Sequence, residues 1–238
     1  MPDFSTRSTR AEKMDDPAAP EESLRQNLRE LEVVNQLLGG YSVVLNALNS
    51  LSLPSNKKVR MADVGCGGGD MLRAIAKWAA PKQIDVQLTG IDLNPIMIAY
   101  AKEHSAGFSN IGFLQRDVMD ETLAGEHFDI VICSLFCHHF PHGALVPLVK
   151  KMYGIAQKAV IINDLHRHWF AWYSIRLLTA IFSKTDMVKH DAPLSVERAF
   201  SRKDLEQIMK EAGISQYTLK WKWAWRWELI IQKPETRS

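Results

Sequence analysis

The chain has 238 residues, of which 46% are hydrophobic and 24% charged, and its net charge at pH 7 is +2. This length and composition allow one domain with a full hydrophobic core, and the mild charge balance without a basic block argues against a nucleic-acid-binding protein. Three cysteines, an odd number in or beside apolar segments, favour free thiols in a reducing compartment over a disulfide framework.

The N-terminal part divides into a polar tail and two helices. Residues 1–20 are polar and contain prolines, so we expect them to be disordered. Within residues 21–56, apolar residues recur at helical spacing as far as Gly39-Gly40, and a second helix is expected over 42–51. The first residues lack an apolar secretion core and no apolar run reaches transmembrane length, so we expect a cytoplasmic protein without stable membrane insertion.

A glycine-rich turn follows the first predicted strand, over residues 59–64, and precedes an apolar helix over about 71–78. A turn this dense in glycine lets backbone N–H groups approach a ligand closely, because no Cβ intervenes. The following helix directs its positive end toward the same place. The segment therefore predicts a site for a polar small molecule at the carboxyl end of the first strand.

The spacing within this turn excludes two common nucleotide sites. A dinucleotide fingerprint, G-x-G-x-x-G, needs its last glycine where Asp70 or Leu72 stands, and no Gly-Lys-Ser/Thr follows to make a P-loop. The pattern present is D-x-G-x-G-x-G, beginning at Asp63. An acid there would repel a pyrophosphate but can accept hydrogen bonds from a cationic amino-acid group.

Two further apolar segments end in an acid in the same way. Residues 86–92 end at Asp92, before the helix-starting pair Asn94-Pro95, and residues 111–117 end at Asp117. A carboxylate at a strand tip can accept hydrogen bonds from both hydroxyls of a ribose. Either acid alone could instead be a helix cap or a loop residue, but three such units in order make coincidence improbable.

Together these motifs resemble the class I S-adenosylmethionine-dependent methyltransferases, and the resemblance covers about residues 57–232. It implies S-adenosylmethionine as the cofactor, with Asp92 on the ribose and Asp117 on the adenine amine, flanked by apolar neighbours. The residues that the resemblance assigns to cofactor binding are Asp63, Gly65, Cys66, Gly67, Gly69, Asp92, Leu93, Asp117, Val118 and Ser134.

The alternation of strands and helices from residue 59 onward predicts an α/β fold with a parallel sheet covered on both faces. The resemblance implies a Rossmann-like, seven-stranded, mostly parallel sheet with an antiparallel C-terminal hairpin and an N-terminal helical cap. A last helix over 204–212 has a Ser201-x-x-Asp204 cap and stops at Gly213. The strands expected before it span 59–64, 86–92, 111–115, 129–134 and 159–164.

Residues 217–231 alternate strictly between apolar and polar, the period of a strand with one buried face. Four tryptophans interleaved with cations could instead form a nucleic-acid stacking platform. The resemblance favours the hairpin, with a bend near residues 223–225 and the tryptophans packed on helices or along a pocket wall.

Histidines follow the fourth and fifth predicted strands, where ligands bind in such sheets. His138 and His139 lie in a Leu-Phe-Cys-His-His-Phe-Pro segment that resembles the L-H-H-L-P loop of small-molecule methyltransferases. Either is a candidate base for a hydroxyl that attacks the methyl group, and either could merely cap a helix or pack under the cofactor. His166 and His168, after the fifth strand, are further candidates. We expect no metal site, because the spacing lacks the glutamate and helix of a zinc hydrolase and methyl transfer needs no metal.

Residues 169–182 are apolar nearly all round, so this helix must be buried, line a pocket or lie on a membrane. We favour a pocket wall and lid, with a loop through 189–193 gating entry. The expected organisation is a tail (1–20), a helical cap (21–56) and a methyltransferase domain (57–238) with a lid insertion at about 166–200.

The predicted function is methyl transfer to a small apolar acceptor of an aromatic, polyketide-like or quinone-like kind, at oxygen in preference to carbon. The alternatives are a C-methyltransferase, a cofactor-binding protein without catalysis, and a nicotinamide-dependent reductase. The sequence leaves the oligomeric state and the acceptor open.

Overall fold

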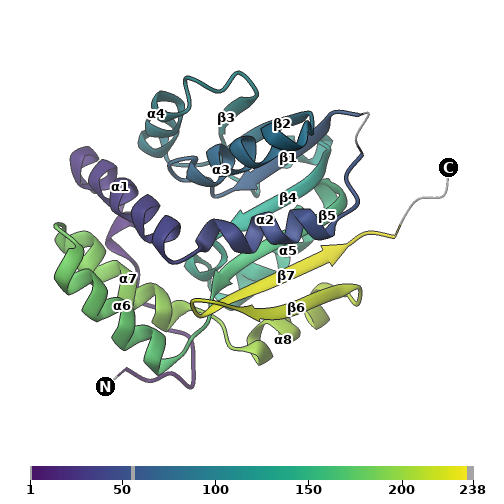
Figure 1. Cartoon of the computed structure of the whole chain (residues 1–238). Helices are drawn as coiled ribbons and strands as arrows, with labels where there is room; N and C mark the ends of the chain where they lie inside the picture. Colours follow the sequence, from purple (N-terminus) through teal and green to yellow (C-terminus); the bar gives the residue numbers. More distant parts are fainter. Residues whose placement is uncertain (1, 55–56, 235–238) are drawn as a thin grey trace.

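The computed structural model describes residues 2–54 and 57–234, and its centre is one seven-stranded sheet (Figure 1). The strand order is β3-β2-β1-β4-β5-β7-β6; β1 to β5 are parallel, and β7 and β6 are added antiparallel. This confirms the predicted fold class. The strands are β1 (Val59–Val64), β2 (Val86–Asp92), β3 (Ile111–Gln115), β4 (Phe128–Ser134), β5 (Ala156–Leu165), β6 (Tyr217–Lys222) and β7 (Arg226–Gln232).

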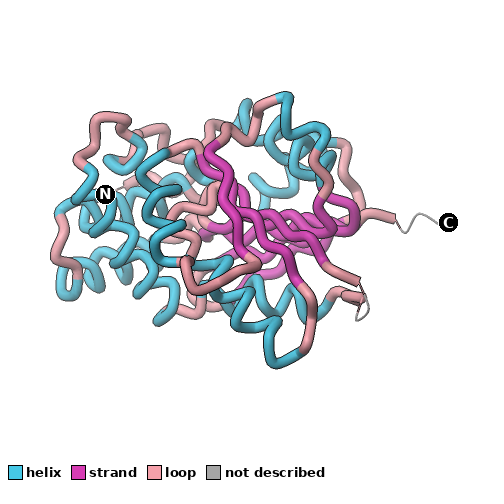
Figure 2. Tube along the Cα trace, turned by 90° about the horizontal axis from the view of Figure 1, so that it is seen from above, coloured by secondary structure: helices cyan, strands magenta, loops and turns pink. Residues whose placement is uncertain are grey.

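Helices cover both faces of the sheet, as the view from above shows (Figure 2). One core joins α2 (Gly40–Ser50), α3 (Asp70–Ala79) and α4 (Pro95–His104) to the sheet, and the other joins α5 (His142–Ile155) and α8 (Arg202–Ala212) to its opposite face. The central strands read as continuous apolar runs because both of their faces are buried.

A third group of helices lies at one end of the sheet: α1 (Glu21–Leu37), α6 (Trp169–Phe182) and α7 (Asp186–Arg198). This is the end at which the parallel strands have their carboxyl termini, on the left in Figure 1. Helices α6 and α7 pack side by side, and α1 contacts α7. In open parallel sheets this end is where ligands bind.

Local signals in the sequence set several element boundaries. The side chain of Asn94 accepts hydrogen bonds from the N–H groups of Ile96 and Met97, which caps α4. Ser201 and Asp204 form a capping box on α8, which ends at Gly213. These predicted caps are confirmed. Other ends move by a few residues: β4, β5, α2 and α8 begin earlier than predicted, at Phe128, Ala156, Gly40 and Arg202.

The N-terminal tail is not a disordered arm in this structure. The guanidinium of Arg7 donates to the carbonyl groups of Arg198, His138 and Phe140, and the N–H groups that follow Glu12 donate to the Asp191 carboxylate. The expectation of disorder considered only the composition of the segment. Its polar groups find partners far away in the chain, which composition does not reveal.

The segment expected to be a gating loop, residues 189–193, is part of helix α7. Thr185 caps this helix, and Pro193 lies inside it. An internal proline removes one backbone hydrogen bond. Buried side chains such as Val188, Leu194 and Val196 hold the helix against the rest of the protein, and this packing offsets the loss.

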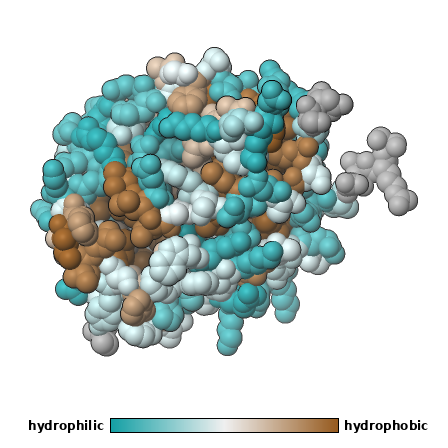
Figure 3. Space-filling model, in the orientation of Figure 1, coloured by the Kyte–Doolittle hydropathy of each residue, from teal (hydrophilic) through white to brown (hydrophobic). Residues whose placement is uncertain are grey.

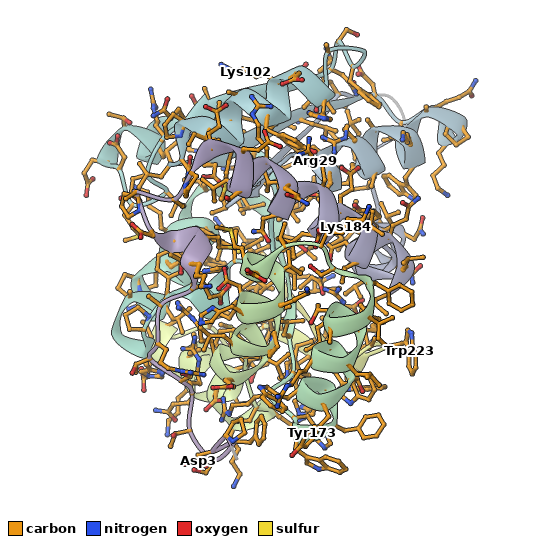
Figure 4. The ribbon with its side chains drawn as sticks, turned by 90° about the vertical axis from the view of Figure 1, so that its left-hand side faces the viewer. Asp3, Arg29, Lys102, Tyr173, Lys184 and Trp223 are labelled. Atoms are coloured by element: carbon orange, nitrogen blue, oxygen red, sulfur yellow. The ribbon has the colours of Figure 1, made fainter. Side chains whose placement is uncertain are left out.

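The tryptophan-rich end forms the predicted hairpin, with β6 and β7 joined at residues 223–225. Trp227 is buried in the core, whereas Trp221 and Trp223 are exposed, and Trp223 projects from the surface in Figure 4. In the described part of the chain, every helix is too short or too polar to cross a bilayer.

Candidate functional site

A cavity of about 950 Å³ opens at the carboxyl ends of the parallel strands. Its walls come from the glycine-rich turn, from the ends of β1, β2 and β4, from α1, α6 and α7, and from the N-terminal segment. Cavities of a few hundred to about 1,000 Å³ accommodate small ligands. All residues predicted to bind the cofactor line this cavity except Gly69, which instead starts α3.

The turn after β1 depends on glycine for two reasons. Gly65, Gly67 and Gly69 have positive φ angles of 70°, 47° and 72°. A Cβ on Gly65 would lie 2.2 Å from Cγ of Phe136, so the turn and this ring pack without room for a side chain. The result is a backbone that any ligand in the cavity can approach directly.

Asp63 leaves a buried polar atom without a partner. Its side chain is buried at the end of β1, and Oδ1 has no hydrogen bond among the described residues. Burial, followed by the negative charges of Asp70 and Asp92, raises the pKa of Asp63 well above its usual value. Such an atom calls for a polar or cationic ligand group, because an unpaired buried acceptor is costly.

Asp92 is held rigidly at the end of β2. Its Oδ2 accepts a hydrogen bond from the N–H of Gly67 at 2.9 Å, and its Oδ1 accepts one from the N–H of Asn94 at 2.9 Å. Burial raises the pKa of Asp92, and these backbone hydrogen bonds act in the opposite direction. Each oxygen retains a lone pair for a ligand hydroxyl.

The third acid and its neighbours lie on the same wall. Asp117 is exposed and accepts a hydrogen bond from the N–H of Met119, while Val118 is buried beside it. Ser134, at the end of β4, accepts a hydrogen bond from the side chain of Asn163. Cys66 is buried, and burial raises the pKa of its thiol.

His138 is buried where the loop after β4 meets the end of β5. Its Nδ1 lies 2.7 Å from Oδ1 of Asp164, and its backbone N–H donates to Oδ2 of the same carboxylate at 3.2 Å. A carboxylate partner makes Nδ1 the protonated nitrogen, so the lone pair of the neutral ring lies on Nε2. Burial acts to raise the pKa of Asp164, but the charge and hydrogen bond of His138 outweigh it, so that pKa is lowered.

The sequence analysis missed Glu12, which the N-terminal segment brings to His138. The Glu12 side chain is buried, and its Oε1 lies 3.7 Å from Nε2 of His138. Burial raises the pKa of Glu12 to about 7. His139 lies beside it, with Nδ1 2.9 Å from Oδ1 of Asp15. A single polar glutamate in a polar tail carries no local signal of such a contact.

The two histidines after β5 lie elsewhere. His168 caps α6 through a hydrogen bond from the N–H of Phe170, and His166 packs edge-on against Trp227. Neither lines the cavity. Burial, followed by the charges of His168 and Arg167, lowers the pKa of His166 to about 4. The structure thus brings His138 and His139 together with the predicted cofactor residues and leaves the other two histidines outside.

Helices α6 and α7 give the cavity an apolar wall, which includes Ile175, Leu178, Val188 and Val196. The opposite side of α6 is exposed and also apolar, with Leu177 63% exposed. This side contributes to the brown area on the left in Figure 3. In the side view, α6 and α7 lie below α1, and Tyr173 points outward from α6 (Figure 4).

Comparisons with known proteins agree with this geometry. Residues 61–158 match the family model described as "Methyltransferase domain". The ubiquinone biosynthesis O-methyltransferase of Coxiella burnetii is 34% identical over 86 residues, which is 36% of this chain and 34% of that relative. The chain therefore spans about a third of the length of this curated relative.

Solved structures share the whole fold at low identity. An O-methyltransferase family protein from Burkholderia thailandensis gives a TM-score of 0.65 at 13% identity, covering 94% of this chain and 63% of that chain. A magnesium protoporphyrin IX methyltransferase from Synechocystis, crystallised with bound SAH, gives a TM-score of 0.51 at 15% identity, covering 90% of this chain and 84% of that chain. At these identities the likeness establishes the fold.

Proposed function

We propose that this chain, whose residues 61–158 match the "Methyltransferase domain" model, is a class I S-adenosylmethionine-dependent enzyme that methylates an oxygen of a small apolar acceptor. One observation carries the proposal. The glycine turn with its strand-end acids, His138 and an apolar helical wall all line the same cavity, and Asp164 is hydrogen-bonded to His138. Aromatic, quinone-like or polyketide-like molecules suit such a wall, and the name of the curated relatives, ubiquinone biosynthesis O-methyltransferase, supports oxygen over carbon.

The residues present fit the cofactor. The glycine-rich turn, which lacks Cβ atoms, lets the cofactor approach the backbone closely. The unpaired Oδ1 of Asp63 can accept a hydrogen bond from its ammonium group, directly or through water. The free lone pairs of Asp92 can accept hydrogen bonds from its ribose hydroxyls. Asp117 and Val118 would hold the adenine. When bound, the cofactor supplies an electrophilic methyl group on a sulfonium.

His138 is the side chain best placed to accept the proton of an acceptor hydroxyl. Asp164 holds its Nδ1, so the lone pair of the neutral ring lies on Nε2, which stands 3.7 Å from Oε1 of Glu12 in the wall of the cavity. A positioned base of this kind contributes roughly 10²–10⁴-fold, whereas aligning the reacting atoms contributes about 7–11 kcal/mol. Helices α6 and α7 would supply most of that alignment by enclosing the apolar part of the acceptor and excluding water. In the same proposal, α1 and α2 form a cap and α6 with α7 forms the lid.

The decisive experiment is transfer of a labelled methyl group from S-adenosylmethionine to panels of phenols, quinols and fatty acids. The expected result is label in an ether of a phenolic or quinol acceptor, released with one equivalent of S-adenosylhomocysteine. Calorimetry with S-adenosylhomocysteine and with NADH tests the cofactor separately. Binding of NADH alone would support a reductase, and binding of S-adenosylhomocysteine with no turnover on any acceptor would support a binding protein.

A further inference from the structure

We propose that Glu12, His138 and His139 bind one divalent transition-metal ion of the Zn²⁺ class at the acceptor end of the cavity. One ligand atom from each of the three residues lies within 4.8 Å of the other two. All three residues line the cavity. The chemical role of the ion rests on the proposed function. Binding of the ion is inferred from these side chains alone.

Glu12 supplies the observation that points to a cation. Only 3% of the residue and 1% of its side chain are exposed. Oε2 accepts a hydrogen bond from Oγ of Ser195 at 2.9 Å, but Oε1 has no hydrogen-bond partner. The nearest basic atoms, Nε of Arg198 and Nε2 of His138, stand 3.6 Å and 3.7 Å from Oε1. A buried carboxylate oxygen without a donor needs a positive partner.

Both histidines are held in the way that metal-binding histidines usually are. Nδ1 of His138 is bonded to the carboxylate of Asp164, and Nδ1 of His139 to that of Asp15. A carboxylate on one ring nitrogen fixes the orientation of the ring and leaves the other nitrogen as the metal-binding lone pair. Such a pairing on one histidine is common, but here it occurs on two adjacent residues whose rings lie 4.4 Å apart.

Arg198 lies at ion-pair distance from the cluster, with Nε 3.6 Å from Oε1 of Glu12 and Nη1 3.6 Å from Oδ2 of Asp15, but its hydrogen bonds go to backbone carbonyls. Arg198 donates its N–H groups to the carbonyl oxygens of His138, His139 and Arg10, and Arg7 donates to those of His138, Phe140 and Arg198. These contacts fix the backbone around the cluster. Three carboxylates surround it, from Glu12, Asp15 and Asp164, and a bound cation would lie among them beside the guanidinium of Arg198.

The donor set selects the class of ion. Two imidazoles and one carboxylate suit Zn²⁺ and related first-row ions, whereas Mg²⁺ prefers oxygen donors in an octahedral arrangement. Three protein ligands leave a position for a further ligand, as in catalytic zinc sites. An acceptor hydroxyl bound there would lose its proton more easily. With the ion present, the two histidines would act as ligands, so the proton of a bound acceptor hydroxyl would pass to solvent water and not to His138.

The test is a titration of the full chain, freed of metal by a chelator, with Zn²⁺ by calorimetry and with Co²⁺ by visible absorption. We expect about one equivalent to bind, with absorption bands of a low-symmetry Co²⁺ site. Glu12→Gln and His139→Asn should each weaken binding roughly 100-fold or more, because each removes a direct ligand. The matched control is His142→Asn, since that exposed ring is paired with Glu211 away from the cluster.

Affinity for S-adenosylhomocysteine, measured on every variant, separates loss of the metal site from misfolding. If the unmodified chain takes up neither ion, binds Mg²⁺ in preference to Zn²⁺, or binds it equally well after Glu12→Gln, the metal site is refuted. Ion binding without methyl transfer to any acceptor would leave the site standing and reject the proposed function. Methyl transfer by a chain that takes up no ion would reject the metal site and leave the proposed function standing.

Discussion

Nδ1 of His138 lies 2.7 Å from Oδ1 of Asp164, and the backbone N–H of His138 donates to the other oxygen of that carboxylate. His138 lies in the segment after β4 and Asp164 near the end of β5, and these two strands are adjacent and parallel. This double contact with one carboxylate fixes the ring of His138, and it leaves Nε2 on the side of Glu12, 3.7 Å from Oε1.

Replacing His138 should stop the reaction without loosening the cofactor. For His138→Asn we expect turnover to fall about 100-fold or more, because the variant lacks the imidazole that acts as base or metal ligand. Affinity for S-adenosylhomocysteine should stay within about threefold of that of the wild type. The comparison is His168→Asn, in which asparagine can still cap α6. Steady-state kinetics and calorimetry on both variants check this. Equal activity of the two would show that the chemistry takes place elsewhere.

Asp92→Ala should weaken binding of S-adenosylhomocysteine at least tenfold, or about 1.4 kcal/mol, because the carboxylate is assigned to the ribose hydroxyls. Asp85→Ala removes an exposed acid at the start of the same strand and should leave affinity unchanged. Calorimetry gives both numbers, and circular dichroism verifies that Asp92→Ala is folded. An unaltered affinity would remove Asp92 from the binding site.

Gly65→Ala should damage both the fold and the site. The new Cβ would lie 2.2 Å from Cγ of Phe136, at a φ of 70° that alanine rarely adopts. Strain and overpacking together should lower the free energy of unfolding by about 3 kcal/mol. Gly143→Ala, in α5 with no atom near its Cβ position, should be neutral or slightly stabilising. Urea unfolding of the pair measures this, and similar midpoints would contradict it.

The inner side of α6 should matter for the acceptor and the outer side should not. Ile175 lines the cavity, whereas Leu177 is 63% exposed on the same helix. Ile175→Lys should raise KM for an apolar acceptor at least tenfold, because it buries an ammonium group in the apolar wall. Leu177→Lys should leave KM unchanged. If the two lysine variants behave alike in acceptor kinetics, α6 is not the acceptor wall.

His166 should make stability depend on pH. Its pKa is lowered from 6.5 to about 4 in the folded chain, mainly by burial, so unfolding favours protonation. The stability present above pH 6.5 is therefore lost as the pH falls from 6.5 toward 4. Allowing for solvent contact, the loss should be about 1 kcal/mol. His166→Asn should lack this component, so denaturant titrations at pH 7 and pH 4.5 should show the wild type losing more stability. An equal loss in both would refute it.

The sequence by itself determined the sheet and the cofactor crevice, because both depend on local patterns. Apolar runs ending in Asp63, Asp92 and Asp117 fix strands and acids together, since the carboxyl ends of parallel strands meet at one edge. The caps at Asn94 and Ser201 likewise depend on residues at most a few positions away.

Only the tertiary structure decided which histidines share the cavity and what accompanies them. His138, His139, His166 and His168 all follow strand ends, and nothing in their spacing separates them. Glu12 reaches His138 across more than half of the chain, and the contacts that place it, from Arg7 and Asp191, join segments whose order no periodicity encodes. Such long-range contacts form because buried polar groups must find partners, and the folded chain alone determines which partners are within reach.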